Sequence, residues 1–122
     1  MAEAIPENTK WVIIEVAKVD GKETMFIARD ILRLEEGWVG NIVWFVFTAG
    51  WELKAEVGVQ FPLNPDGINP QPDPTRPGCW TSAAANMAHG EKFPYNINVQ
   101  QTVGSASLTR IDPVVENEPP TP

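Results

Sequence analysis

Hydrophobic and polar residues alternate near the beginning of the chain. The two alternating sets are Trp11, Ile13, Glu15 and Ala17 on one face and Val12, Ile14, Val16 and Lys18 on the other. A period of two is typical of a β-strand, and this one is apolar on at least one side. Asp20-Gly21 favours the positive φ angles of a two-residue hairpin turn. A second strand, at about residues 22–28, is therefore expected to return antiparallel to the first.

The most apolar run of the chain is IVWFVF, from Ile42 to Phe47. Consecutive β-branched and aromatic residues indicate a strand that is buried on both faces, at the centre of the fold. The next segment, residues 51–61, alternates polar and apolar positions toward its end, which predicts a half-buried strand. Gly58 within this segment indicates a bulge or a close approach of the backbone to a neighbour.

Three further regions have weaker patterns. Residues 30–37 fit either a short helix or the end of a strand, because an aspartate begins the segment and a glycine ends it. Residues 81–89, TSAAANMAH, favour one or two helical turns. Residues 95–103 and 105–111 return to strand-like patterns, and Gly104-Ser105 is expected to form the hairpin turn between them.

Prolines are concentrated between residues 62 and 77, where six of the chain's twelve prolines occur. Because each proline removes a backbone donor and fixes φ, no regular strand or helix is expected there. We therefore predict a long loop over residues 62–79. Loops of this length in a compact domain tend to be functional, so this one is interpreted either as a lid or binding loop or as an ordinary surface loop.

These elements together predict an all-β fold. Short strands with turn signals and no alternating helices favour a single small antiparallel β-sandwich or barrel of six to seven strands with one long proline-rich loop. The chain is interpreted as one domain over residues 1–122, with a flexible N-terminus at residues 1–9 and a tail at residues 119–122.

Composition excludes several classes of partner. The chain has 122 residues and a formal net charge of −7, and its few basic residues are scattered. Nucleic acid and anionic membrane surfaces are bound by clustered Lys and Arg, so neither is an expected partner. The longest apolar run is much shorter than the roughly 20 residues of a spanning helix, and the N-terminus does not resemble a signal peptide. A cytoplasmic location is therefore expected.

Metal and nucleophile chemistry have little support in the sequence. The single cysteine, Cys79, and the single histidine, His89, are too few for a structural zinc site, and neither lies in a recognisable nucleophile motif. Free cysteines usually pack as small hydrophobic residues, which is the expectation for Cys79. Glycine-rich phosphate loops and the GxSxG elbow are absent from the sequence, so no cofactor and no metal are expected. Among the kinds of catalytic chemistry considered, only chemistry carried out by carboxylates remains.

Two of the five aspartates, Asp73 and Asp112, directly precede proline. An aspartate carboxyl can attack its own main-chain carbonyl, and because proline has no N–H, closure through oxygen expels the proline nitrogen and cuts the chain. The competing interpretation is structural, since Asp-Pro often occurs where a turn or an extended segment begins.

The segment IDPVVENEP, with Asp112-Pro113 followed by Glu118-Pro119, resembles the signature of the DP-EP family of small bacterial proteins. The resemblance covers less than a tenth of the chain. It implies a small all-β barrel or sandwich, and an aspartic-peptidase-like, self-processing activity has been proposed within the family. The chain lacks the Asp-Thr/Ser-Gly triplet of ordinary aspartic peptidases, and no catalytic residue of the family is carried over here.

An aspartic mechanism requires two carboxylates that share one proton. The candidates for this role are Asp73, Asp112 and Asp66. Each chain of a homodimer would donate one aspartate across a two-fold axis and act on a peptide substrate. In the intramolecular alternative one carboxyl lies beside a susceptible bond of the chain itself, at Asp73-Pro74 or at Asp112 with Asp66 as its partner.

The alternative function is a noncatalytic β-sandwich module that binds a partner or assembles with itself. Trp38, Trp51 and Trp80 lie outside the most regular strand patterns and are interpreted either as interface residues or as core residues. In this alternative the segment VVEN, residues 114–117, is an edge strand that the following prolines end.

Overall fold

A computed structural model of the chain describes residues 9–28, 30–35, 37–63, 68–76, 78–85, 92–111 and 113–117. Twelve strands in three sheets make up its regular structure, and no helix occurs in these ranges. The predicted all-β class is confirmed. The same ranges hold no helix of the length and hydropathy that a membrane crossing requires.

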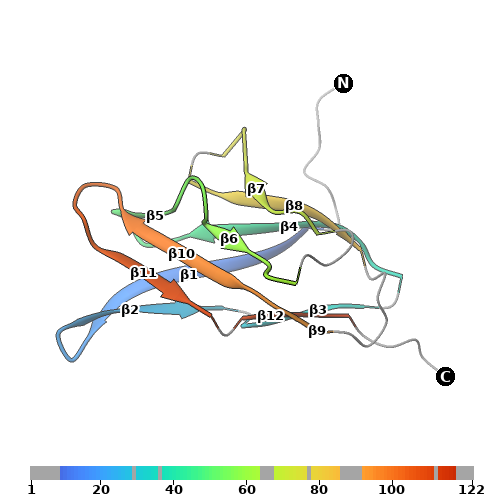
Figure 1. Cartoon of the computed structure of the whole chain (residues 1–122), viewed down its shortest axis with the longest axis horizontal. Coiled ribbons are helices and arrows are strands. Elements are labelled where there is room, and N and C mark those ends of the chain that lie inside the picture. Colours follow the sequence, from blue (N-terminus) through green and yellow to red (C-terminus); the bar gives the residue numbers. More distant parts are fainter. Residues whose placement is uncertain are drawn as a thin grey trace.

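The largest sheet has five strands in the order β2-β1-β4-β8-β7 (Figure 1). Its strands are β1 (Thr9–Val19), β2 (Lys22–Ile27), β4 (Val39–Val46), β7 (Gln71–Pro72) and β8 (Trp80–Ala85). β1 and β4 run parallel, with Trp11 opposite Val43, and the other neighbours are antiparallel. The apolar run around Trp44 therefore lies in the middle of this sheet, as predicted.

Two smaller sheets complete the fold. One contains β11 (Ser107–Arg110), β10 (Asn96–Gln101) and β5 (Trp51–Leu53), with β6 (Val59–Gln60) also paired to β10. The other contains β3 (Ile31–Leu34), β12 (Val114–Asn117) and β9 (Lys92–Pro94), in the order β3-β12-β9. Figure 1 shows β10 and β11 crossing in front of β1 and β4 as a second layer.

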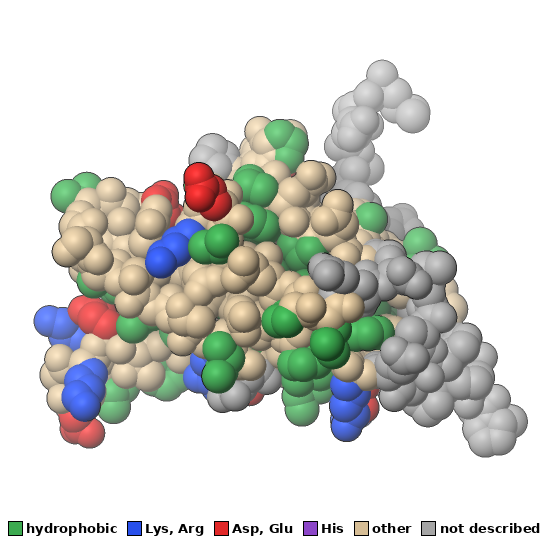
Figure 2. Space-filling model, in the orientation of Figure 1, with side chains coloured by type: hydrophobic (Ala, Val, Ile, Leu, Met, Phe, Trp, Pro, Cys, Tyr) green, Lys and Arg blue, Asp and Glu red, His purple; other side chains and the backbone are tan. Residues whose placement is uncertain are grey.

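The hydrophobic core lies between the layers. It includes Val12 and Ile14 of β1, Trp44 of β4, and Ile97 and Val99 of β10, all fully buried. These are the inward residues of the predicted alternation, since a β-strand directs every second side chain to the same side. The outer face of β10 is polar instead, and Figure 2 shows the surface over β10 and β11 as mostly tan, with few charged side chains.

A cluster of three aromatic residues fills the centre of the core. The Trp44 Nε1–H donates a hydrogen bond to the Tyr95 hydroxyl at 3.2 Å. Phe61 stacks on Tyr95 with ring centroids 4.7 Å apart and contacts Trp44 edge-on. Burial raises the pKa of the Tyr95 phenol far above its usual range, although the hydrogen bond with Trp44 opposes this effect, so the hydroxyl stays protonated.

Both predicted hairpins are confirmed. Asp20 and Gly21 have φ angles of 52° and 78°, the left-handed values that a tight turn between β1 and β2 requires. Gly104, with φ 132°, lies in the turn between β10 and β11. The close backbone approach predicted at Gly58 is also present, because a Cβ atom at that position would lie 2.6 Å from Nε1 of Trp80.

Several sequence predictions are wrong in detail. The fold has twelve described strands rather than six or seven, it is not a closed barrel, and two pairs, β1 with β4 and β3 with β12, are parallel. Residues 51–61 form β5 and β6 with a turn between them, because both short strands pair with the longer β10. In the central run Ile42, Val43, Trp44 and Val46 are buried, but Phe45 is only half-buried and Phe47 is 66% exposed.

Tertiary pairing overrides local propensity in three other segments. Residues 31–34 form β3 because they pair with β12, and residues 81–85 belong to β8 because they pair with β4. The predicted helical turns at 86–89 lie outside the described residues. The proline-rich segment was expected to contain no strand, but it forms the short strand β7, in which Pro72 is paired with β8. The segment VVEN is the central strand of its sheet rather than an edge strand, with Val115 fully buried.

The predicted terminal segments lie largely outside the described part of the chain. Residues 1–8 and 118–122 are not described, and Thr9 already belongs to β1.

Candidate functional site

The structure describes one of the three candidate aspartates. Asp66 and Asp112 lie outside the described residues, as does His89. Asp73 directly follows β7 and is buried, with 8% of its surface exposed. The site is therefore built from Asp73.

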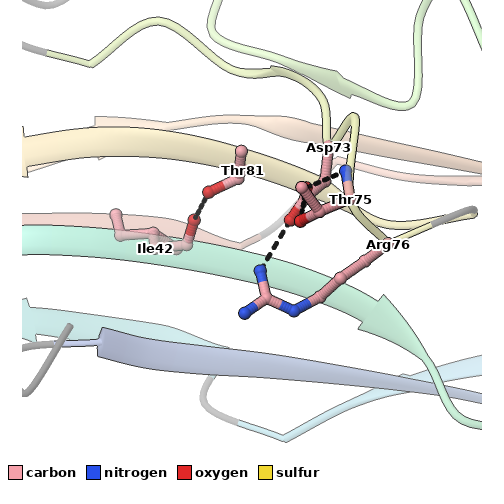
Figure 3. Close-up of polar contacts among 5 residues, drawn as sticks. All are labelled: Ile42, Asp73, Thr75, Arg76 and Thr81. Atoms are coloured by element: carbon pink, nitrogen blue, oxygen red, sulfur yellow. Dashed lines mark hydrogen bonds and ion pairs between the residues drawn. The ribbon is translucent and has the colours of Figure 1, made fainter. Parts of the chain in front are cut away.

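The Asp73 carboxylate is held by the turn that follows it (Figure 3). Its Oδ1 accepts hydrogen bonds from the backbone N–H and the hydroxyl of Thr75, each at 2.8 Å. Its Oδ2 accepts a charge-assisted bond from Nη1 of Arg76 at 2.7 Å. An aspartate that bonds the backbone two residues on is typical of a tight turn, and here the turn also fixes the arginine.

This cluster lies on the outer face of the five-stranded sheet. Gln71 of β7 is opposite Thr81 of β8, which is opposite Val43 of β4, so these alternate positions face outward with Asp73. A pocket of about 180 Å³ is lined by Thr9, Asn41, Val43, Asp73, Arg76 and Thr81. The Arg76 guanidinium stacks 5.6 Å from the centroid of the Trp11 ring, which extends the site onto β1.

The electrostatics of the cluster keep Asp73 ionised. Burial alone would raise the pKa of the Asp73 carboxyl, but the hydrogen bonds from Thr75 and the hydrogen bond and positive charge of Arg76 outweigh it and hold the pKa below its ordinary value. Cys79 is buried nearby, and burial, together with the negative charge of Asp73, raises the pKa of its thiol despite the opposing charge of Arg76. The thiol is therefore protonated at neutral pH, and Cys79 is the buried side chain that was predicted.

Asp73 is unsuited to be the proton-holding carboxyl of an aspartic pair. Such a pair consists of one protonated and one ionised carboxyl, and Asp73 has a lowered pKa, with Thr75 and Arg76 as its hydrogen-bond and ion-pair partners in the described chain, so only the ionised position is compatible with it. Both carboxylate oxygens are engaged, which opposes attack on the carbonyl before Pro74. Within the described ranges, no group of three or more His, Cys, Asp or Glu side chains is arranged to hold a metal ion.

A second feature of the same sheet is a group of large apolar side chains on its outer face. Trp11 and Ile13 of β1 are each 37% exposed, Phe26 of β2 is 45% exposed, and Phe45 is half-buried beside Phe47, with ring centroids 6.4 Å apart. We call these five residues the aromatic face. The register places them side by side, because Ile13 is opposite Phe45 and the neighbouring Glu15 is opposite Phe26.

Sequence reasoning missed the aromatic face and singled out other tryptophans. Trp80 is buried, and Trp38 and Trp51 are partly buried and packed against the core. The signal for the exposed residues was present in the alternation, because Trp11 and Ile13 are apolar on the face of β1 opposite to the buried one. No pattern in the sequence identified Thr75 and Arg76 as hydrogen-bond partners of Asp73, because these contacts are seen only in the folded turn.

In comparison with known proteins, no family model and no curated protein matches the sequence of this chain.

The hydrogen-bonded Asp73 predicts a pH-dependent stability. Because its pKa is lowered in the folded state, its contribution is complete above the unfolded pKa of about 3.9 and is lost as the pH falls through the folded pKa. Asp73→Asn is therefore expected to lower the free energy of unfolding by about 1.5 kcal/mol at pH 7. The difference from the wild type should shrink as urea unfolding is repeated below about pH 4.

Asp20→Asn is the matched control for this measurement, since it makes the same chemical change at an exposed hairpin turn. It should change the stability by less than about 0.5 kcal/mol at pH 7. An Asp73→Asn effect that is equally large at low and neutral pH would contradict the assigned role of the charge.

Proposed function

We propose that the protein is a noncatalytic β-sandwich module that binds a protein partner through the aromatic face. The observation that carries the proposal is the exposure of Trp11, Ile13, Phe26 and Phe47 on the outer side of the five-stranded sheet. Contiguous exposed apolar patches on a folded domain mark interaction sites, because water contact with this much apolar surface is unfavourable.

The other outer face of the molecule supports this interpretation by contrast. The outward residues of β10 are Asn96, Asn98 and Gln100, which are all polar and alternate with apolar inward residues, and Asn98 is itself buried and hydrogen-bonded to Val57 and Thr109. The outward residues of β1 and β4 depart from that alternation. Aromatic residues at positions that are usually polar indicate that this outer face is covered by a partner.

The Asp73–Arg76 cluster contributes to the same surface. Because the Asp73 carboxylate fixes the guanidinium, Arg76 lies over Trp11 in one orientation and remains partly exposed, with 36% of its side chain accessible. Trp and Arg are enriched among the residues that carry binding energy in interfaces. In this proposal Asp73 is a positioning residue rather than a catalytic one.

A second candidate function is the aspartate-dependent self-cleavage that the DP-EP resemblance implies, and one observation favours it. The Val114 N–H donates to the Asp30 carbonyl at 2.9 Å, so Asp30 lies beside the start of β12. Its Oδ1 is buried and has no hydrogen-bond partner in the described part of the chain, while Oδ2 is 3.6 Å from Nη2 of Arg110. Asp30 therefore lies beside Val114, which is two residues after Asp112 in the sequence, and the second candidate rests on these two aspartates.

Hydroxyl-radical footprinting read by mass spectrometry tests the proposed function. Trp11, Phe26 and Phe47 should be oxidised in dilute purified protein and protected several-fold in a concentrated extract of cells that express it. Exposed Val103, in the turn after β10, is the internal control and should be labelled equally in both samples. Equal labelling of the aromatic face in both samples would overturn the proposal.

Intact masses from the same samples address the second candidate. A noncatalytic module stays at 13.5 kDa at about pH 4 and about pH 7.5. Loss of the ten residues 113–122 in the wild type, but not in Asp112→Asn or Asp30→Asn, would replace binding by self-cleavage as the better account.

A further inference from the structure

We infer that the partner of the aromatic face is a second copy of this chain, which packs against it sheet to sheet in a two-fold symmetric dimer. This inference rests on the proposed function and names the occupant of the same surface. Three properties of the face carry it: its charge, its area and its residue pattern.

The charge of the face differs from that of the whole chain. The chain carries a net charge of −7, so two copies repel each other over most of their surface. The described charged residues that face outward from the five-stranded sheet are Glu15 on β1, Lys22 on β2, and the Asp73–Arg76 ion pair. Two acidic and two basic groups make this face neutral, so two copies can meet here without like-charge repulsion.

The same neutrality disfavours other classes of partner. A strongly basic partner would be attracted to the acidic remainder of the surface rather than to a face with no net charge, and an acidic partner would be repelled by that remainder. An apolar, neutral face is complementary to itself. This is the requirement of an isologous interface, in which the same patch is contributed by both subunits.

The area of the sheet is comparable with that of one side of a small interface. Its five strands have 11, 6, 8, 2 and 6 residues, and at about 3.3 Å by 4.8 Å for each residue they form a face of about 500 Å². A specific protein interface buries about 800 Å² on each partner, so a second copy would cover the whole face and the adjoining Asp73–Arg76 turn.

The residue pattern places the strongest contacts near the centre. The pairs Trp11–Val43 and Ile13–Phe45 lie on β1 and β4, which are inside the sheet rather than at its edges. Phe26 on the edge strand β2 and Phe47 at the end of β4 flank them. Stacked sheets lie about 10 Å apart, so aromatic side chains from two copies would interdigitate across the axis.

Sedimentation velocity over a dilution series from about 1 µM to about 500 µM tests the inference. The wild type should approach twice its 13.5 kDa mass as its concentration rises. Phe47→Asp places a carboxylate on each side of the interface and should weaken association by at least about 100-fold. Leu63→Asp is the matched control, since Leu63 is 63% exposed against 66% for Phe47, and it should leave association unchanged.

Each outcome decides between the proposals. Circular dichroism and the urea midpoint should show that both variants are folded, because both replaced side chains are mainly exposed. A wild type that is monomeric at about 500 µM overturns the dimer, and if the footprint is still protected in extract, the proposed binding function stands with a different partner. A dimer that both variants weaken equally would show that association uses another surface.

Discussion

Trp44→Ala is expected to lower the free energy of unfolding by about 4 kcal/mol, the cost of deleting a large buried aromatic side chain. Trp44 has no exposed surface and contacts Phe61 and Tyr95 edge-on. Its removal leaves a cavity between the two layers and also leaves the Tyr95 hydroxyl without the indole donor at 3.2 Å. Because folded domains are stable by only about 5–15 kcal/mol, this variant should unfold at a much lower urea concentration.

Two further variants separate the causes of this effect. Tyr95→Phe removes only the hydroxyl that accepts from Trp44 and should cost about 1–3 kcal/mol, because a buried N–H is left without an acceptor. Leu63→Ala, at an exposed position, should change the stability by less than about 0.5 kcal/mol. A Trp44→Ala cost no larger than that of Leu63→Ala would show that the aromatic cluster does not support the two layers.

Gly58→Ala is expected to cost about 3 kcal/mol, at the upper end of the usual range for inserting a methyl group into a packed region. The added Cβ would lie 2.6 Å from Nε1 of Trp80 and 2.7 Å from the carbonyl oxygen of Lys54. The second contact is with backbone, so it is relieved only by moving the turn that joins β5 to β6. The same turn accepts the Trp80 Nε1–H at the Lys54 carbonyl, at 3.1 Å, and this bond should weaken as well.

The test is a double-mutant cycle with Trp80→Phe, measured by urea unfolding. The smaller ring relieves the contact with the indole but not that with Lys54, so Gly58→Ala should cost less in the Trp80→Phe background than in the wild type. If the two changes in the free energy of unfolding simply add, residues 58 and 80 do not compete for space, and the contact with Trp80 is not what requires a glycine at position 58.

Local patterns were sufficient where a strand and its neighbour are joined by a tight turn. Asp20-Gly21 and the alternation beside it predict β1, β2 and their antiparallel pairing, because the turn geometry and the side-chain period are both properties of the local sequence. The central position of Trp44 followed from continuous apolar residues in the same way.

Pairing between distant segments was not predictable from such patterns. Residues 31–34 had no clear pattern of their own, and they form a strand because β12 aligns parallel with them. Residues 82–85 are serine and alanine, which have little strand propensity, and they extend because they pair with β4. Pro72 was expected to prevent a strand, but β7 is at the edge of its sheet, where a missing donor is tolerated.

The candidate site was predictable only in part. Asp73 was selected because it precedes a proline, and the structure places it in the lining of a pocket, where its carboxylate is held by contacts that its sequence context did not indicate. Its charge is committed to Thr75 and Arg76, and Arg76 in turn lies over Trp11, more than sixty residues away in sequence. Such contacts depend on the assembled sheet, so the sequence alone identifies the residue but not its task.

The parallel pairing of β3 with β12 has a consequence for synthesis of the chain. Ile31 is opposite Val114, so β3 leaves the ribosome about 80 residues before its partner, a delay of about 4–16 s at about 5–20 residues per second. During that time the backbone groups of β3 that pair with β12 in the finished fold have no partner strand. The nascent chain must therefore keep a segment that contains Leu32 and Leu34, both buried in the finished fold, from pairing with another chain until β12 is made.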